Sequence, residues 1–268
     1  MFNRNFNIAL IESDIAWGDK QANLDQLRND LERVPDNTDL VVLPEMFSTG
    51  FISGNQEMAQ ELAERNTGDT MRMLHDIARE RQMAICGSFL AATAGQVFNR
   101  AFFIEPNGDD TFYDKRHLFS YSGEDKVYHQ GHTEAPVVRF RGLNIKLVVC
   151  YDLRFPVFCR TQRRSSYDLL VVVANWPTSR QHVWRTLLAA RAMENESYVV
   201  GVNRRGTDNA GTPYGVGSSM IIDFKGKPIA ATSEECNIAC ATLSPEAIEN
   251  FREKFPAWQD ADDFNIYI

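Results

Sequence analysis

Short apolar runs alternate with amphipathic stretches along most of the chain. Apolar runs typical of buried strands occupy residues 6–11, 39–43, 83–90, 97–104, 143–150, 169–174 and 198–202. Helical spacing of apolar positions predicts helices over residues 19–34 and 70–81, and around Trp184, Leu187, Leu188 and Ala192. This alternation predicts layered sheets flanked by helices, but it does not tell one sheet from two.

Turn and capping residues separate these elements. Pro35 ends the first helix, and Pro106-Asn107-Gly108 predicts a hairpin connection. Pro156 predicts a helix that begins shortly after Cys150, and Ser244-Pro245 predicts the start of the last helix. Before that last helix, a β-meander is predicted over residues 217–223, 227–231 and 238–243.

The composition is that of an ordinary globular protein. Of the 268 residues, 44% are hydrophobic and 24% are charged, and we expect one domain over residues 1–268. The net charge of −8 disfavours nucleic acids and anionic membranes as partners. The first residues lack the apolar core of a signal peptide, and no run approaches the ~18 apolar residues of a membrane span. We therefore expect a cytoplasmic protein.

The five cysteines are scattered and odd in number, which suits a reducing compartment. Cys236 and Cys240 have no second Cys or His pair nearby in the sequence, so we expect small apolar residues of a late strand rather than zinc ligands. His129 and His132 also lack a carboxylate ligand pattern and are expected in a polar loop. Neither a metal nor an organic cofactor is expected.

Three polar residues lie where predicted strands end, namely Glu45, Lys115 and Cys150. Sites in α/β sheets are commonly built at such strand ends. Each residue alone has an ordinary explanation as a surface charge or a core thiol. Together they supply a base for the thiol proton, a cation for the thiolate and the oxyanion, and a nucleophile. The helix predicted after Cys150 would add its N-terminal dipole, and the backbone N–H of Tyr151 is placed to face the site.

The segments around these residues resemble the carbon–nitrogen hydrolase, or nitrilase, superfamily. The matching segments are Leu-Pro-Glu at 43–45, Asp-Lys-Arg-His-Leu-Phe at 114–119 and Cys-Tyr-Asp-Leu-Arg-Phe-Pro at 150–156. They occur in the order of that family, and the resemblance extends through residues 174–177, 191–195 and 201–204. It implies an α/β (α+β) fold, a four-layer α-β-β-α sandwich, and assembly into a homodimer or a larger homo-oligomer.

The resemblance also implies roles for the residues. Cys150 would attack the substrate, Glu45 would act as the general base, and Lys115, with the Tyr151 N–H, would hold the oxyanion. The family uses a second glutamate in the loop after the lysine, which here matches Glu124. Glu124 would orient Lys115 and the substrate amide.

Within the superfamily the chain is most similar to the bacterial omega-amidases, through residues 150–156 and 173–177. These enzymes hydrolyse the terminal amide of short dicarboxylate monoamides such as 2-oxoglutaramate. The distal carboxylate of such a small-molecule substrate calls for an arginine, and Arg154 and Arg180 are the two candidates. Aromatic candidates for the pocket wall are Phe119, Tyr151 and Trp176, with Phe47 as a further one.

Other functions compete with this interpretation. A nitrilase or an N-carbamoyl-amide hydrolase would use much the same groups, because the triad alone does not determine the substrate. A Cys-His hydrolase is a further alternative, with His117, His129, His132 and His182 available. A non-catalytic scaffold would keep the fold alone, and the presence of all three reactive groups argues against it.

Overall fold

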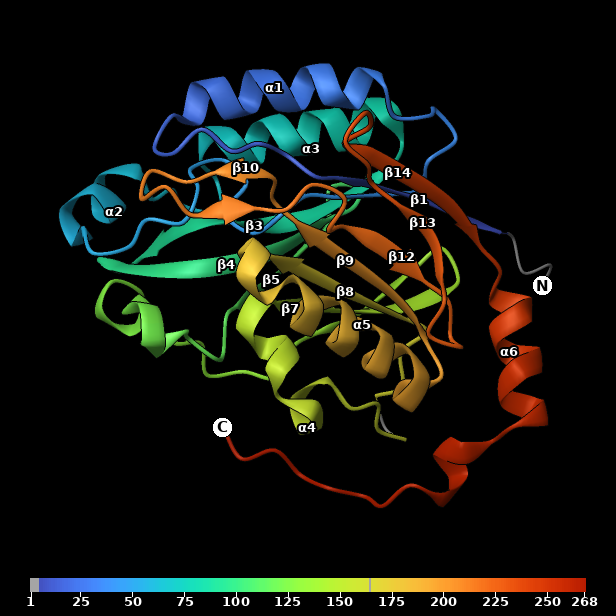
Figure 1. The fold of residues 1–268 in the computed structure, drawn as a ribbon. Helices are drawn as coiled ribbons and strands as arrows, with labels where there is room; N and C mark the ends of the chain where they lie inside the picture. Colours follow the sequence, from blue (N-terminus) through green and yellow to red (C-terminus); the bar gives the residue numbers. More distant parts are fainter. Residues whose placement is uncertain (1–4, 164) are drawn as a thin grey trace.

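Two six-stranded sheets form the centre of the computed structural model, which describes residues 5–163 and 165–268 (Figure 1). The first sheet has the order β14 (Ile238–Leu243), β1 (Phe6–Ile11), β2 (Leu40–Val42), β3 (Ala84–Thr93), β4 (Gln96–Ile104), β5 (Asp110–Asp114). The second has the order β13 (Pro228–Ala231), β12 (Met220–Ile222), β9 (Tyr198–Asn203), β8 (Leu169–Ala174), β7 (Leu143–Val149), β6 (Val137–Phe140).

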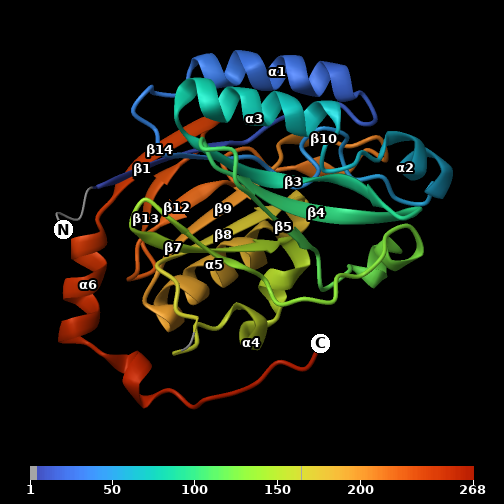
Figure 2. The same cartoon turned by 180° about the vertical axis from the view of Figure 1, so that it is seen from behind.

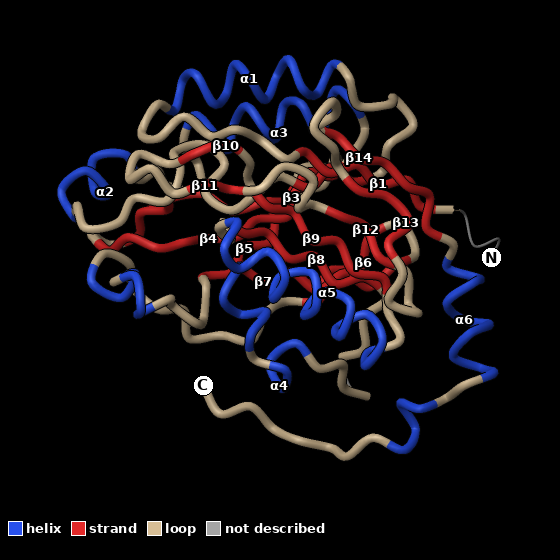
Figure 3. Tube along the Cα trace, viewed as in Figure 1, coloured by secondary structure: helices blue, strands red, loops and turns tan. Residues whose placement is uncertain are grey.

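Helices cover the outer faces of both sheets, so the layers run helix, sheet, sheet, helix. Helices α1 (Lys20–Glu32) and α3 (Asp69–Arg81) lie on the first sheet, and α5 (Gln181–Asn195) lies on the second, with α4 (Pro156–Cys159) beside it (Figures 1 and 2). Figure 3 shows the strands enclosed by these helices, with α2 (Gln56–Leu62) and α6 (Pro245–Lys254) at opposite ends of the molecule. The predicted four-layer sandwich is confirmed.

Burial explains why the strand runs were visible in the sequence. All six residues of β8 are buried, as expected for a strand between parallel neighbours with both faces covered. The apolar stripe of α5 packs Trp184, Leu188 and Ala192 into the same core. The predicted cap at Ser244 is present, because its side chain accepts from Ala247 N at the start of α6. The Asp19 side chain caps α1 in the same way by accepting from Ala22 N.

The predicted meander is wrong in its third strand. β12 and β13 pair as an antiparallel hairpin, but β14 pairs antiparallel with β1 in the first sheet. Glu12, directly after β1, accepts hydrogen bonds from Ser219 N and Thr232 Oγ1, both 2.8 Å, and so ties the hairpin to the other sheet where β14 begins. Residue periodicity does not specify which neighbour a strand pairs with.

The helix predicted to open at Pro156 is confirmed as α4, but it does not adjoin Cys150. Residues 150–154 form a short 3-10 helix, η3 (Cys150–Arg154), and α4 begins only after the extended residue Phe155. The expected helix dipole therefore does not start at the thiol. Cys236 lies in the loop before β14 rather than in a strand, and both it and Cys240 are exposed.

Several short elements were not predicted from the sequence. They are α2, β6 and a two-stranded ribbon of β10 (Gly206–Thr207) and β11 (Pro213–Tyr214). Short 3-10 helices complete the chain: η1 (Ser120–Ser122), η2 (Glu124–Lys126), η4 (Thr178–Arg180) and η5 (Ala257–Asp260). Among the described residues, no helix has the length and apolar character needed to cross a membrane.

Candidate active site

The structure brings Glu45, Lys115 and Cys150 together from both sheets. Glu45 follows β2, Lys115 follows β5, and Cys150 follows β7. The Lys115 Nζ atom lies 3.1 Å from Glu45 Oε1, and the charges of both residues act on the Cys150 thiol. Glu45 and Lys115 are each 1% exposed and Cys150 is 9% exposed. Residues far apart in the chain therefore form one nearly dry cluster.

Glu124, the first residue of η2, holds Lys115 from the other side. Its two carboxylate oxygens lie 2.9 and 2.8 Å from Lys115 Nζ, and Oε2 also accepts the backbone N–H of Phe119. Burial acts to lower the pKa of Lys115, but the charges of Glu124 and Glu45 outweigh it, so this pKa lies well above its usual value. The ammonium is therefore fixed as a cation.

Burial raises the pKa values of Glu124 and Cys150, whereas it acts to lower that of Lys115. Burial raises the pKa of Glu124, Lys115 acts to lower it, and the nearby charge of Glu45 raises it further. Burial and then Glu45 raise the pKa of the Cys150 thiol well above its usual value, against the opposing effects of Lys115 and the Asn175 backbone N–H. The thiol is therefore protonated at neutral pH and needs a base before it can attack.

The backbone at Cys150 is strained. Cys150 has φ of 50°, in the left-handed region that a residue with a side chain rarely adopts. Asp152, two residues later, is fully buried and accepts hydrogen bonds from Val149 N at 3.0 Å and Tyr113 Oη at 2.9 Å. The sharp turn that presents the thiol is thus held from within its own segment and from β5.

Asp152 also holds the segment that carries Lys115. It accepts from the backbone N–H of His117 at 3.0 Å, and Nδ1 of His117 lies 2.8 Å from the same carboxylate oxygen. The His117 ring stacks on Phe155 at 3.8 Å between centroids. This histidine therefore orients the loop through Asp152, and the Cys-His alternative gains no support from its placement.

Buried polar residues that the sequence analysis did not identify complete the site. Asn99, on β4, donates to Glu45 Oε1 at 2.7 Å and to Glu124 Oε1 at 3.4 Å. Asn175 donates through Nδ2 to the Glu45 carbonyl at 3.2 Å, and its buried Oδ1 has no hydrogen-bond partner among the described residues. Nothing in the local pattern of β4 distinguishes Asn99 from any other polar strand residue.

A comparison with protein-family models identifies the family of the chain. The model described as Carbon-nitrogen hydrolase matches residues 7–253. The chain belongs to this family.

Relatives of the hydrolase extend the assignment over nearly its whole length. Omega-amidase YafV of Escherichia coli is 41% identical over 261 residues, covering 97% of this chain and 98% of the relative. A 2-oxoglutaramate amidase of Bacillus subtilis is 28% identical, covering 95% and 97% of the two chains. The crystal structure of a CN-hydrolase superfamily protein from Xanthomonas campestris, with an arsenic adduct in its active site, superposes with a TM-score of 0.92 at 38% identity and covers 98% and 99%.

These matches confirm the predictions of family, fold and enzyme class. The protein is a hydrolase of non-peptide carbon–nitrogen bonds, and amidases are among its relatives. Among the described residues, no group of three or more His, Cys, Asp or Glu side chains is placed to hold a metal ion.

The two arginine candidates of the hydrolase have different surroundings. Neither forms an ion pair within residues 5–163 and 165–268. Arg154 is exposed, with its guanidinium 5.2 Å from the ring centre of Trp176, a buried residue. Arg180 is half-buried, with its guanidinium 4.6 Å from the ring centre of Phe119.

Phe119 connects Arg180 to the cluster of Glu45, Lys115, Glu124 and Cys150. Its ring packs edge-on against Tyr151 at 4.9 Å between centroids, and its backbone N–H binds Glu124. Tyr151 directly follows Cys150 in the chain. Arg180, Phe119 and Tyr151 therefore form a continuous wall whose last member directly follows Cys150 in the chain, whereas the exposed Arg154 lies against Trp176. Phe47 packs in the core beneath α1 and α3 and is not part of this wall.

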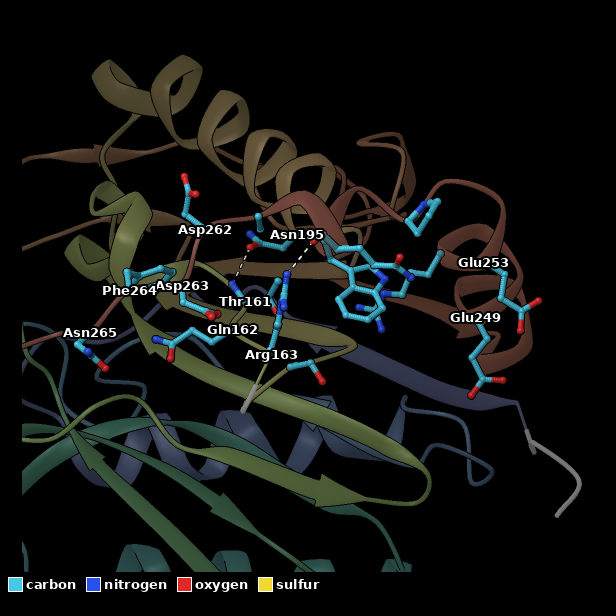
Figure 4. Close-up of a pocket in the computed structure, with 16 residues that line it drawn as sticks. Thr161, Gln162, Arg163, Asn195, Glu249, Glu253, Asp262, Asp263, Phe264 and Asn265 are labelled. Carbon is cyan, nitrogen blue, oxygen red and sulfur yellow. Dashed lines mark hydrogen bonds between the residues drawn. The ribbon is translucent and has the colours of Figure 1, made fainter.

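A separate cavity of about 960 Å³ lies away from this cluster, between α6, the C-terminal segment and residues 161–163 (Figure 4). Asn195 accepts from Thr161 N at 2.8 Å, and Arg163 donates to the Gln259 carbonyl at 2.7 Å, both at the cavity wall. None of the predicted site residues lines it.

Proposed function

We propose that this hydrolase is a thiol-dependent amidase that cleaves the terminal amide of short dicarboxylate monoamides of the 2-oxoglutaramate type. The observation that carries the proposal is a buried thiol with a raised pKa, together with a carboxylate and a fixed ammonium. Such a thiol reacts only if a neighbouring base removes its proton during the attack. Glu45 is the carboxylate available for this step.

In the first half-reaction, Glu45 takes the proton from Cys150 as the sulfur attacks the amide carbon. The carbonyl oxygen becomes an oxyanion, which Lys115 Nζ and the Tyr151 backbone N–H stabilise. Glu45 then returns the proton to the leaving nitrogen, the carbon–nitrogen bond breaks, and ammonia departs. A thioester on Cys150 remains.

In the second half-reaction, Glu45 removes a proton from water, and the hydroxide attacks the thioester carbon. The same two groups hold the second oxyanion. When the carbon–sulfur bond breaks, the thiolate regains its proton from Glu45 and the carboxylic acid product is released. Glu124 acts throughout by holding Lys115, with both carboxylate oxygens committed to hydrogen bonds.

The substrate class rests on the relatives and on Arg180. Relatives named omega-amidase and 2-oxoglutaramate amidase cover most of this chain. Arg180 provides a half-buried guanidinium with no described ion-pair partner, at the far end of the wall that begins beside Cys150. Because arginine binds carboxylates in a bidentate geometry, we assign the distal carboxylate of the substrate to Arg180.

The test is ammonia release from 2-oxoglutaramate, succinamate, glutamine and a simple nitrile, with Cys150→Ala as the blank. We expect release from the two dicarboxylate monoamides only, and none from the variant. Turnover of the nitrile instead would make the enzyme a nitrilase, and release that persists in Cys150→Ala would remove the mechanism.

Arg180→Ala tests the carboxylate contact, with Arg154→Ala as the matched control. We expect Arg180→Ala to raise KM for succinamate by about 10- to 100-fold, the typical effect of losing a charged hydrogen bond, and to leave KM for butyramide unchanged. The same effect in Arg154→Ala alone would reverse the assignment.

We further propose a cytoplasmic homodimer. All five cysteines are unpaired, which suits a reducing compartment. Exposed apolar side chains lie on α4, on α5 and in the segment that follows α6: Val157, Met193, Phe255, Trp258 and Tyr267. Burying them against a second copy would remove this apolar surface from water. Light scattering coupled to gel filtration should give twice the chain mass, and the mass of one chain would contradict the proposal.

A further inference from the structure

Asn99 contacts all the segments that carry charge in the site. Its side chain is fully buried and donates to one oxygen of Glu45 and to one of Glu124. Its backbone carbonyl accepts the N–H of Lys115 at 2.9 Å. No other described residue hydrogen-bonds to all three.

The orientation of the Asn99 amide is fixed by Ser88. The Ser88 hydroxyl accepts the backbone N–H of Met46 at 3.0 Å and donates to Asn99 Oδ1 at 2.9 Å. Met46 has φ of 52°, so the turn directly after Glu45 is held in the left-handed region. Because Oδ1 is occupied by a donor, the NH₂ group must face the two carboxylates.

This arrangement makes the two oxygens of Glu45 unequal. Oε1 accepts from both Asn99 and Lys115, at 2.7 and 3.1 Å. Oε2 accepts no hydrogen bond within residues 5–163 and 165–268. On the basis of the proposed function, we propose that Asn99 is a positioning residue that occupies Oε1 and leaves Oε2 as the oxygen that exchanges protons with Cys150, the leaving nitrogen and water.

A neutral donor suits this place. Two carboxylates share one ammonium here, so a further cation would compete with Lys115 for its partners, whereas an amide stabilises both negative charges without changing the net charge. The titratable groups that face the two carboxylates from the surrounding elements are Lys115, Cys150, Tyr128 and Tyr214. None of them can replace the Asn99 donor at Oε1 except Lys115, which already binds there.

The test is Asn99→Leu, which keeps the branching of the side chain at Cγ and removes the donor. We expect kcat to fall about 100-fold with KM for the amide changed less than about threefold. The acid limb of the kcat/KM profile should move to higher pH by about one unit, because carboxylates that lose a donor bind protons more tightly. Ser88→Ala keeps the Asn99 donor but frees its amide to turn and removes the acceptor of the Met46 N–H, and it should shift the same limb in the same direction by less.

Asn195→Leu is the matched control. Asn195 is also a buried asparagine with both ends hydrogen-bonded, to Thr161 N and the Arg191 carbonyl, but it lies at the end of α5. Asn195→Leu therefore measures how much the loss of a buried, hydrogen-bonded asparagine lowers stability when the residue is remote from the site. A pH profile in Asn99→Leu that coincides with those of the wild type and Asn195→Leu would overturn the proposal.

A second readout separates this inference from the substrate assignment. Iodoacetamide modification of Cys150, followed by mass spectrometry of its peptide, needs no amide substrate. Asn99→Leu should slow it about tenfold at pH 8, because Glu45 no longer presents Oε2 to the thiol. If the wild type fails to cleave any amide but this rate still falls, the proposed substrate is wrong and the role of Asn99 stands. An unchanged rate contradicts the role of Asn99.

Discussion

Burial and the negative charge of Glu45 raise the pKa of the Cys150 thiol well above its usual value. A thiol with a raised pKa is protonated at neutral pH, so its ionised fraction grows with every unit of pH up to that pKa. We therefore expect the rate of Cys150 alkylation by iodoacetamide to be low at pH 7 and to rise through pH 9 without a plateau. The exposed Cys236 provides the comparison within the same sample. A plateau near pH 7 would show a low-pKa thiolate and contradict this electrostatic picture.

The same residue-scale argument supports Glu45 as the proposed base, because Glu124, the other carboxylate that acts on the thiol among the described residues, is committed to Lys115 and the Phe119 N–H. Glu45→Gln keeps the shape of the side chain but cannot accept the proton. We expect kcat to fall by at least about 1,000-fold, since the group acts as both base and acid, while substrate binding changes little. Steady-state kinetics on succinamate measure the effect, with the exposed Glu253→Gln as the control. Activity within tenfold of the wild type would exclude Glu45 as the base.

At the scale of elements, the loop after η2 sets the position of the lysine. The Gly131 N–H donates to the Lys115 carbonyl at 3.0 Å, and a Cβ on Gly131 would collide with the backbone carbonyl of Asp114 at the end of β5. Because that neighbour is backbone, Gly131→Ala must displace the strand end that carries Lys115. We expect kcat to fall at least about tenfold while the chain stays folded.

Gly201→Ala is the control for that prediction. Its Cβ would also collide, with Leu188 and Trp184 at the packing of α5 on β9, away from Lys115. Overpacking there should lower the free energy of unfolding by about 1–3 kcal/mol and leave kcat of the folded enzyme unchanged. Urea denaturation and steady-state kinetics on both variants separate the two effects. Equal losses of kcat would mean that the Gly131 effect is general destabilisation.

The sequence predicts a helix or strand well where a continuous run of residues is buried. It predicts poorly which neighbouring strand an element pairs with. The apolar runs of β8 and β9 and the capped start of α6 follow from local pattern. The pairing of β14 with β1 does not, because a strand has the same alternation whichever sheet it joins.

The candidate site divides in the same way. Glu45, Lys115, Glu124 and Cys150 stand in motifs that can be recognised along the chain. Asn99 and Asp152 could not be assigned roles, because their importance comes from side-chain contacts with residues that lie 25 to 54 positions away and reach them only in the folded structure. The choice between Arg154 and Arg180 likewise depended on which aromatic ring each guanidinium contacts.

For the whole molecule, the site places three charged side chains inside the core. Lys115, Glu45 and Glu124 are charged groups at 1%, 1% and 0% exposure between two sheets, and burying them is costly unless each is paired. The raised pKa of Lys115 means that its contribution is fully present below about pH 10.4, the ordinary lysine value, and is lost as pH rises through the folded pKa. At neutral pH the charge of Lys115 therefore offsets the free-energy cost of burying the two carboxylates.

Lys115→Met should expose this dependence. The variant leaves two buried carboxylates without their cation, which should lower the free energy of unfolding at pH 8 by about 3–5 kcal/mol. The carboxylates then bind protons more tightly in the folded chain than in the unfolded chain, so the stability of the variant rises as pH falls, by up to about 1.4 kcal/mol per pH unit for each proton taken up. The gap between wild type and variant, measured by urea denaturation, should therefore narrow between pH 8 and pH 5.5. Adding Glu45→Gln and Glu124→Gln to the variant should restore most of the loss at pH 8. A gap that is the same at both pH values would mean that the loss comes from packing around the lysine and not from the uncompensated charges.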